Sequence, residues 1–263
     1  MLQKVFASGL DVTALQNLRQ TIMDMVASGA SEKISVSRMH RFPENAAETK
    51  FVRSILRFFW SSGLGQFYRQ TYEREPLLLL EHCTIRVQQP QPDGNYVPWH
   101  LDANFYGFGV PMLTAWVPLV DVGTTAPGLE FADISGRLSD SELRRIWTSL
   151  KTDELGRRSL NDQGLEELFG RDVRRRPVAI KTGGFCIFDQ TVLHRTQVMP
   201  DATETRMAIE FRIADRDNLP SDVLPRAFKG MLMSWTDPDS GKIQVGYAEC
   251  SVPPGRSQRP GLD

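Results

Sequence analysis

Residues 206–212 read RMAIEFR, with apolar side chains alternating with polar or small ones. A period of two is typical of a half-buried β-strand, and residues 84–88, TIRVQ, alternate in the same way. Further strands are expected at 77–80, 112–118, 128–131, 178–181 and 185–189, where short apolar runs lie between turn residues. From about residue 77 the chain is therefore predicted to consist mainly of β-strands.

The chain before these strands has helical periodicity. Asp11 and Thr13 are candidate N-caps for a first helix that ends near Gly29. A second amphipathic segment follows Pro43, and glycines at 63–65 interrupt it. Helices first and strands afterwards predict a mainly β chain with helical supports (α+β), in the form of a sandwich or barrel.

Two segments depart from the strand pattern. Residues 137–172 are polar and helix-like, with a helix start at 139–142 and a short helix at 165–169, and we expect an insertion over the mouth of a barrel. Residues 215–263 form a C-terminal extension, with a hairpin around 239–241 that packs on the barrel. Its last residues, PPGRSQRPGLD, are poor in apolar side chains and are expected to be disordered.

Composition limits the function classes. With 41% hydrophobic and 24% charged residues and a net charge of −1, the chain gives no reason to expect a nucleic-acid or membrane partner. The arginine run at 174–176 is interpreted as a solvated loop or the start of a strand. Three widely spaced cysteines and the absence of a signal-peptide or membrane-span pattern favour a cytoplasmic protein without disulfides or structural zinc.

A candidate metal site combines two distant segments. His100 and Asp102 are two residues apart, so in an extended segment both side chains project from one face. His194 follows the Gly-Gly turn at 183–184 and the strand at 185–189, and a late strand of an antiparallel barrel commonly returns beside an early one. Two imidazoles and one carboxylate form the facial triad that suits iron(II). We therefore predict that His100, Asp102 and His194 are metal ligands and the catalytic centre.

A cation follows the last of these residues. Arg206 lies twelve residues after His194, at the start of its strand. A guanidinium binds a carboxylate bidentately and stays charged, which suits the distal carboxylate of 2-oxoglutarate. Thr196 can add a hydroxyl donor, and Arg212 is the alternative cation on the same face.

Other candidate residues have a structural interpretation as their first explanation. We expect His82 in the core or behind the metal site, and His40 on the surface or at the rim of a substrate entrance. Phe105, Tyr106 and Phe108 follow Asp102 closely and are either core residues or walls of a substrate pocket.

Several segments carry a resemblance to a known family. The stretches 99–102, 114–119, 126–130 and 189–194, together with Thr196 and Arg206, are similar to the phytanoyl-CoA dioxygenase superfamily of Fe(II)/2-oxoglutarate-dependent oxygenases. The resemblance covers about residues 77–214. It implies a double-stranded β-helix (a cupin-like jelly roll) as the core of a single oxygenase domain, with residues 1–75 as its helical support.

The resemblance also implies a chemistry. Iron(II), 2-oxoglutarate and O2 would be required, with succinate and carbon dioxide as by-products. His100, Asp102 and His194 would be the iron ligands, and Arg206 with Thr196 would bind the far carboxylate of 2-oxoglutarate. By position in the family, Trp116 and Gln88 would also lie beside the co-substrate.

The resemblance says more about the type of reaction than about the substrate. Relatives that halogenate have a small residue in place of Asp102, so its carboxylate implies hydroxylation or another oxidation that begins with hydrogen abstraction. We also expect the insertion at 137–172 to close over the substrate. A small molecule, such as a natural-product or amino-acid-like intermediate of biosynthesis, is the expected substrate. The alternative is a cupin-like metal enzyme or binding protein that does not use 2-oxoglutarate.

Overall fold

The structure is a computed structural model of the 263-residue chain. It describes residues 3–29, 33–36, 39, 45–90, 96–103, 112–134, 138–152, 158–171, 173–216, 232–237 and 239–247. None of the helices in these ranges combines the length and the apolar character needed to cross a membrane.

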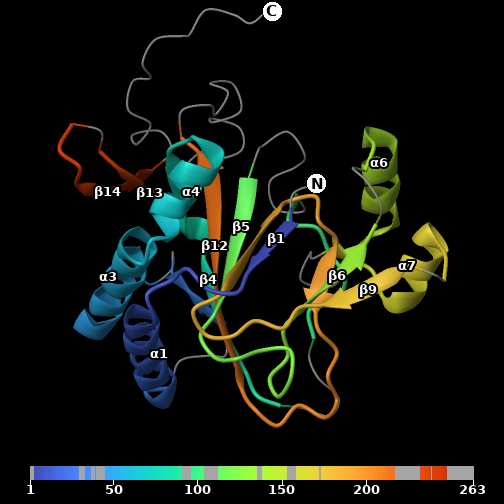
Figure 1. The fold of residues 1–263 in the computed structure, drawn as a ribbon, viewed down its shortest axis with the longest axis horizontal. Coiled ribbons are helices and arrows are strands. Elements are labelled where there is room, and N and C mark those ends of the chain that lie inside the picture. Colours follow the sequence, from blue (N-terminus) through green and yellow to red (C-terminus); the bar gives the residue numbers. More distant parts are fainter. Residues whose placement is uncertain are drawn as a thin grey trace, which may run out of the picture.

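A large antiparallel sheet runs through the centre of the molecule (Figure 1). Strand β12 (Arg206–Asp215) is its longest and pairs with β4 (Thr84–Gln88) on one side and β5 (Met112–Pro118) on the other. Strand β5 also pairs with β10 (Phe185–Asp189), and β10 pairs with β1 (Gln3–Phe6). The alternating segments at 84–88 and 206–212 are therefore neighbours in the sheet.

Four more strands extend the large sheet beyond this centre. They are β2 (Lys33–Ser35), which pairs with β4, and then β3 (Pro76–Leu79), β13 (Leu232–Thr236) and β14 (Ile243–Tyr247), which continue from the far end of β12. Strands β13 and β14 form the predicted C-terminal hairpin, and β13 packs on the sheet through β3.

A small antiparallel sheet lies beside the large one. Its order is β11 (His194–Thr196), β6 (Leu129–Asp133) and β9 (Arg174–Pro177). Residues 99–100 join its β11 edge, because the backbones of His100 and His194 pair. In chain order, β4 lies in the large sheet, residues 99–100 lie at the small sheet, and β5 lies in the large sheet again. Strands β6 and β9 then lie in the small sheet, β10 in the large, β11 in the small and β12 in the large.

Three helices pack on the outer face of the large sheet, as Figure 1 shows for α1 (Val12–Ala27), α3 (Ala46–Ser61) and α4 (Leu64–Tyr72). Their apolar faces share one hydrophobic cluster with the strands. Asp11 caps α1 by accepting hydrogen bonds from the next turn's backbone, and Gly63 separates α3 from α4 in a left-handed conformation (φ 92°). The two predicted helical segments are confirmed.

The predicted insertion contains the helices α6 (Asp140–Ser149) and α7 (Asp162–Phe169), joined by the short strands β7 (Lys151–Thr152) and β8 (Arg158–Ser159). Ser139 and Glu142 form a capping box at the start of α6, as the sequence predicts. The buried side chains of the two helices form a separate core with residues flanking the predicted metal ligands, among them Trp99, Leu101 and Leu193.

One strand prediction needs correction, and one strand was missed. Residues 178–181 are not a strand. The strand is β9 at Arg174–Pro177, and the chain then leaves the sheet to bridge from Ile180 to Val122. The arginine run suits this position because β9 is the exposed edge of the small sheet. Strand β1 was not predicted, and the last residues of the chain lie outside the described part.

Candidate metal centre and adjoining pocket

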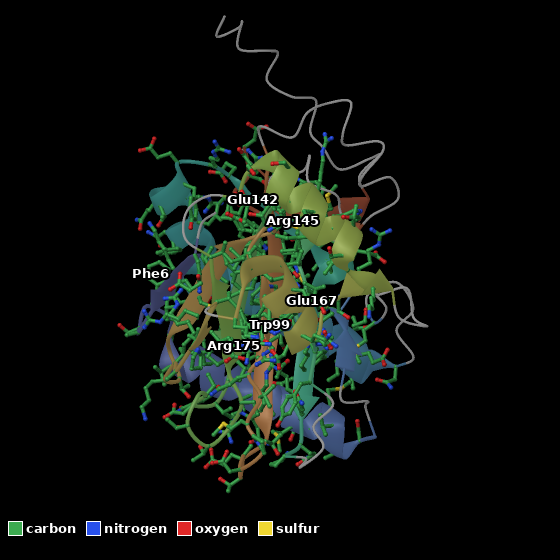
Figure 2. The ribbon with its side chains drawn as sticks, turned by 90° about the vertical axis from the view of Figure 1, so that its right-hand side faces the viewer. Phe6, Trp99, Glu142, Arg145, Glu167 and Arg175 are labelled. Carbon is green, nitrogen blue, oxygen red and sulfur yellow. The ribbon has the colours of Figure 1, made fainter. Side chains whose placement is uncertain are left out.

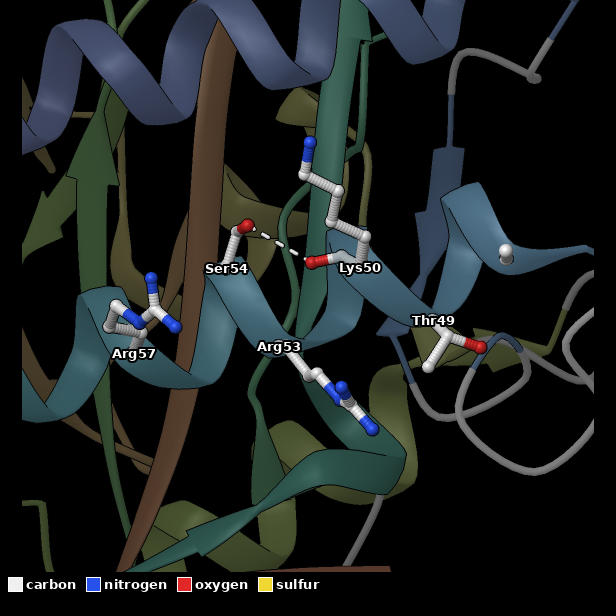
Figure 3. A pocket seen from close by; sticks show the side chains of 6 residues that line it. Thr49, Lys50, Arg53, Ser54 and Arg57 are labelled. Atoms are coloured by element: carbon white, nitrogen blue, oxygen red, sulfur yellow. Dashed lines mark hydrogen bonds between the residues drawn. The ribbon is translucent and has the colours of Figure 1, made fainter.

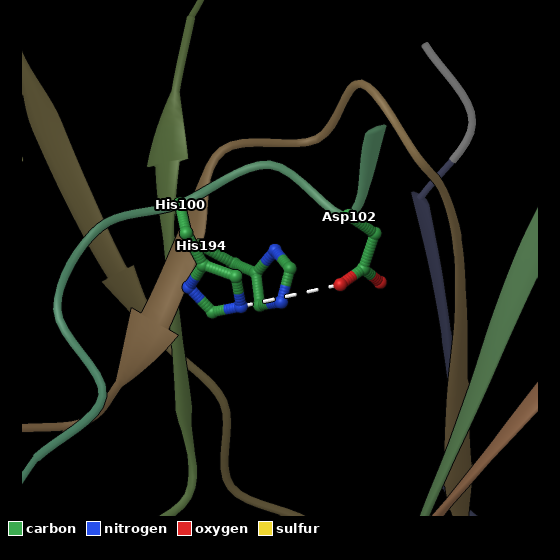
Figure 4. A group of neighbouring side chains, drawn as sticks. All are labelled: His100, Asp102 and His194. Atoms are coloured by element: carbon green, nitrogen blue, oxygen red, sulfur yellow. Dashed lines mark ion pairs between the residues drawn. The ribbon is translucent and has the colours of Figure 1, made fainter. Parts of the chain in front are cut away.

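Three side chains with metal-ligating atoms converge where the two sheets meet (Figure 4). His100, Asp102 and His194 each offer one ligand atom, and these atoms all lie within 4.8 Å of one another. They are the residues that the sequence predicts, and within the described ranges they form the one such cluster of histidine, cysteine and carboxylate groups.

Backbone pairing brings the two histidines together. His100 N donates to His194 O at 2.9 Å, and His194 N donates to His100 O at 3.1 Å. Directly opposed residues project from the same face of a sheet, and the two ring centroids are accordingly 4.2 Å apart. The pairing of a late segment with an early one, expected from the sequence, thus sets the spacing of the site.

Both imidazoles have the hydrogen-bonding pattern of metal ligands. His100 Nδ1 lies 2.8 Å from Pro98 O, and His194 Nδ1 lies 2.9 Å from Val192 O. A carbonyl oxygen only accepts, so each Nδ1 carries the hydrogen and each Nε2 keeps its lone pair. Burial, helped by the neighbouring His194, lowers the pKa of His100 to about 3, and burial also lowers the pKa of His194. Both rings are therefore neutral at pH 7.

The carboxylate is held from the large sheet. Asp102 is fully buried, Thr114 on β5 donates its hydroxyl to Oδ2, and Arg212 on β12 donates to Oδ1 at 3.1 Å. Burial by itself would raise the pKa of Asp102, but the Arg212 guanidinium, the histidines and the Thr114 hydroxyl hold it below its usual value. Asp102 is consequently an anion at pH 7, with Oδ1 4.0 Å from His100 Nε2.

One pocket adjoins this cluster and continues along the inner face of the large sheet. Both histidines line it, and so does the predicted Arg206–Thr196 pair. Its full lining is Arg86, Val97, His100, Leu129, His194, Arg195, Thr196, Arg206 and Glu210.

The predicted co-substrate residues meet at the far part of this pocket. Arg206 is buried, and its Nη1 donates to Thr196 Oγ1 at 2.8 Å and to Gln88 Oε1 at 3.4 Å. Its guanidinium carbon lies 5.4 Å from the centre of the Trp116 ring. Burial, and then the charge of Arg86, lower the pKa of Arg206 to about 10, so it stays cationic at pH 7.

Two buried donors in this region await an acceptor. Arg206 Nε and the indole Nε1 of Trp116 have no hydrogen-bond partner among the residues that the structure describes. Buried donors normally have a hydrogen-bond partner. Here one donor belongs to the buried guanidinium of Arg206, and the other lies on the ring next to it. The donor set fits an anion with several acceptor oxygens, such as a carboxylate.

A side-chain network that the sequence did not predict connects the two parts of the site. Glu210 accepts hydrogen bonds from Thr84 (3.1 Å), Arg86 (3.3 Å) and Arg212 (3.2 Å). Burial opposes ionisation of Glu210, yet Arg86, Arg212 and Arg206 together hold its pKa well below its usual value. The sequence feature that could have revealed this network is the polar face shared by β4 and β12, where Thr84 lies opposite Glu210.

The structure separates the two candidate arginines. Arg206 contacts Thr196 and Gln88, whereas Arg212 contacts Asp102 and Glu210. The first is thus placed for an anion in the pocket and the second for the ligand carboxylate.

The other candidate residues are not part of this cluster. His82 ends the 3-10 helix η1 (Leu80–His82) and is not in the His-Asp-His group. His40 and the aromatic residues Phe105, Tyr106 and Phe108 lie outside the described residues.

A second hollow lies on the outer side of α3, and its lining among the described residues comes from that helix alone (Figure 3). It holds Lys50, Arg53 and Arg57 together with small polar side chains, and its lining includes neither a histidine nor a carboxylate.

Comparison with solved structures shows the fold. The epimerase SnoN in complex with Fe3+, alpha ketoglutarate and nogalamycin RO is 14% identical, with a TM-score of 0.59 over 83% of this chain and 86% of that one. AviO1 from Streptomyces viridochromogenes Tue57 is 14% identical, with a TM-score of 0.55 over 83% and 91% of the two chains. The non-heme alpha ketoglutarate dependent carbocyclase SnoK is 16% identical, with a TM-score of 0.52 over 82% and 80%. No family model and no curated protein matches the sequence.

Proposed function

We propose that this chain is an Fe(II)/2-oxoglutarate-dependent dioxygenase that oxidises a small molecule. The observation that carries the proposal is the shared pocket, which has His100 and His194 in its lining together with Thr196 and Arg206. A keto acid with a second carboxylate has one end suited to a metal and one suited to a guanidinium. The lining of this one pocket offers both kinds of partner.

His100, Asp102 and His194 would hold the iron. Two neutral imidazoles and one anionic carboxylate are the donor set of a non-haem iron(II) site, and they leave coordination positions open. When bound, iron(II), 2-oxoglutarate and O2 supply an oxidant for a C–H bond and yield succinate and carbon dioxide. The protein's contribution is to orient these groups and the substrate and to keep water away.

Arg206 would bind the distal carboxylate of 2-oxoglutarate, with Thr196 and Gln88 orienting the guanidinium and Trp116 lying against it. The two unsatisfied donors, Arg206 Nε and Trp116 Nε1, support this assignment. The contact to Thr196 at 2.8 Å keeps the side chain of Arg206 in place before any ligand arrives.

The strand order supports a double-stranded β-helix as the core. The segments from β4 to β12 cross repeatedly between the large and the small sheet, with β6 and β9 as neighbours in the small one. We accordingly propose a jelly-roll core at 77–214 within a single domain, and membership of the phytanoyl-CoA dioxygenase superfamily. The solved structures with iron or alpha ketoglutarate in their names support the broader enzyme class.

Hydroxylation of a natural-product or amino-acid-like intermediate is the reaction that we propose. The similar structures include an epimerase and a carbocyclase from nogalamycin biosynthesis, which supports a small biosynthetic substrate. Because the same fold serves those outcomes, product analysis should detect epimerised and cyclised molecules as well as hydroxylated ones.

Succinate formation tests the enzyme class directly. Purified protein with iron(II), ascorbate, 2-oxoglutarate and air should form succinate slowly even without substrate, and chelation of iron should abolish this. His194→Ala and Asp102→Ala should lose the activity while keeping the far-UV circular dichroism of the wild type. Tight iron binding without succinate, together with indifference to Arg206→Ala, would instead indicate a metal protein that does not use 2-oxoglutarate.

A further inference from the structure

A second polar cluster adjoins the metal centre, and one of its members, Arg195, also lines the pocket. Its members are neighbours of the histidines in sequence: Trp99 precedes His100, and Arg195 follows His194. Both side chains bond the same carboxylate, because Trp99 Nε1 donates to Asp162 Oδ1 at 2.9 Å and Arg195 Nη1 donates to it at 2.8 Å. Asp162 is the first residue of helix α7, so the cluster joins both ligand segments to the insertion.

Arg195 is the centre of this cluster. It is 8% exposed, its Nε donates to Glu130 Oε2 on β6 at 2.5 Å, and its guanidinium carbon lies 4.5 Å from the centre of the Trp99 ring. One guanidinium thereby fixes its own strand, the neighbouring strand β6, the helix α7 and the segment that carries His100. A planar cation with several donors suits such a multiple contact better than any other side chain.

The apolar side chains of the ligand segments also pack against the insertion helices. His100 and Asp102 belong to the metal centre, while Trp99, Leu101 and Leu193 belong to the core of the insertion helices. The backbone of Trp99 also pairs with Leu160, with N–O distances of 3.1 and 2.8 Å. The described part of the insertion thus packs behind the ligands, on the side of the molecule that faces the viewer in Figure 2.

We propose that Arg195 is a positioning residue, which holds the two histidine-bearing segments against helix α7 and so makes the insertion the frame of the metal centre. The inference rests on the proposed metal site and adds to it a role for residues that touch no metal. It differs from the expectation, drawn from the sequence, that the insertion closes over the substrate. Groups that hydrogen-bond metal-ligating side chains typically contribute 10- to 100-fold to metal affinity, and this cluster would act on the same ligands through the neighbouring backbone.

The first experiment compares two arginines that contact the same carboxylate. Arg175 on β9 contacts Asp162 at 3.4 Å and Glu166 at 2.8 Å, and it bonds neither Trp99 nor the β11 strand. Co2+ would be titrated into metal-free Arg195→Gln and Arg175→Gln protein, and the visible Co2+ spectrum would report the coordination geometry. We expect at least a tenfold loss of affinity and an altered spectrum in Arg195→Gln, with Arg175→Gln within about twofold of wild type.

Arg195→Gln leaves Glu130 without its cation and could therefore fail to fold. Two further variants keep the test decisive in that case. Trp99→Phe keeps an aromatic ring, though a smaller one, and removes the Nε1 donor, and Asp162→Asn keeps the shape and removes the charge. Neither residue lines the pocket, so a loss of Co2+ affinity in both cannot come from a lost pocket contact. Thermal unfolding of the metal-free proteins separates this effect from general destabilisation.

The outcomes distinguish the two levels of the proposal. If wild-type protein binds Co2+ no better than His194→Ala, the proposed metal site fails. If wild type binds well but Trp99→Phe and Asp162→Asn retain its affinity and spectrum, the metal site stands and the positioning role of the cluster is overturned. Equal losses in Arg195→Gln and Arg175→Gln would also overturn it, because any arginine at Asp162 would then suffice.

Discussion

Two arginines on one face of one strand have different partners. Arg206 and Arg212 lie on β12 and both are buried. The sequence offers them as alternatives for one carboxylate, because strand periodicity places them on the same face without saying what lies opposite. The structure places Arg206 beside Thr196 and Arg212 beside Asp102, which makes their roles separable by experiment.

Replacing Arg206 should weaken co-substrate binding. We expect Arg206→Gln to raise the KM for 2-oxoglutarate roughly thirtyfold, since loss of a buried charge partner costs about 2 kcal/mol or more. Steady-state kinetics over a range of 2-oxoglutarate concentrations measure this. The control is Arg69→Gln, which removes an arginine of α4 that is paired with Glu75, and it should leave the KM for 2-oxoglutarate unchanged. A normal KM in Arg206→Gln would refute the assignment of the far carboxylate.

Replacing Arg212 should act on the metal instead. Arg212→Gln removes the cation bonded to Asp102, so we expect iron affinity to fall about tenfold or more while the KM for 2-oxoglutarate at saturating iron changes little. Iron titrations of the metal-free variants of both arginines test this division. The division would be wrong if the two substitutions gave the same pattern.

The ligands could be read from the sequence, whereas some of their supports could not. The two histidines stand out because the chain has only four, and Asp102 stands out because it lies two residues after one of them, a spacing that fits a strand. Glu210 and Asp162 do not stand out, since acidic residues are common. The role of Glu210 depends on contacts across the sheet, and that of Asp162 on contacts to ligand segments more than thirty residues away in the chain.

At the scale of elements, local signals predicted local structure well. Asp11 and the box of Ser139 and Glu142 begin helices where the sequence places them. In the box, Glu142 N donates to Ser139 Oγ at 3.3 Å, and Ser139 N donates to Glu142 Oε2 at 2.7 Å. These contacts span three residues, so no tertiary information is needed to foresee them.

The capping box gives a stability prediction. Ser139→Ala should lower the free energy of unfolding by about 1 kcal/mol, because it leaves helix-terminal backbone donors without their acceptor. Urea denaturation followed by circular dichroism measures the change. Ser54→Ala on α3 is the control, since that hydroxyl only bonds a carbonyl of its own helix, Lys50 O, at 3.0 Å. A loss no greater than that of the control would show that the cap contributes nothing.

Strand β1 shows where local signals fail. Its four residues carry little periodic pattern, and its partner β10 lies about 180 residues away in the chain. The residue that reflects the presence of β1 is Gly184, which packs closely against it. A Cβ added at Gly184 would lie 2.5 Å from Phe6 O and 2.7 Å from Ile180 Cγ2. The sequence suggested a turn at this glycine pair, but the close approach of another strand explains why the second residue is glycine.

This close approach predicts the effect of a single methyl group. Gly184→Ala should destabilise the fold by about 1–3 kcal/mol, as overpacking against backbone usually does. Gly164→Ala in helix α7 is the matched control. There a new Cβ meets only side-chain atoms, at 3.2 Å and beyond, and alanine favours helix. Chemical denaturation of both variants tests the contact, and equal stability of Gly184→Ala and wild type would contradict it.

At the scale of the molecule, the described residues place the candidate metal centre in a seam between two sheets, with helices on both outer sides. The large sheet rests on α1, α3 and α4, and the small sheet with its ligand segments rests on α6 and α7 (Figures 1 and 2). Each sheet supplies part of the candidate centre: the paired histidines come from the small sheet, and the groups that hold Asp102 come from the large one.

At this scale the sequence predicted the class of fold and the meeting of the ligands, but not the edge strands. The change from helical to strand periodicity near residue 76 is visible along the chain, and β4, β5 and β10 have the predicted bounds. The pairing of β9 and β1 depends on which edges remain open once the central strands have assembled, and single-sequence patterns do not encode that.

The most direct test of the account asks whether the His100–Asp102–His194 triad holds iron together with 2-oxoglutarate. Anaerobic iron(II) and 2-oxoglutarate should together give a weak visible charge-transfer band with the wild-type protein. The band should persist in His82→Ala, the histidine control, and should be lost in His194→Ala and Asp102→Ala at unchanged circular dichroism. A band of wild-type intensity in His194→Ala would contradict the account.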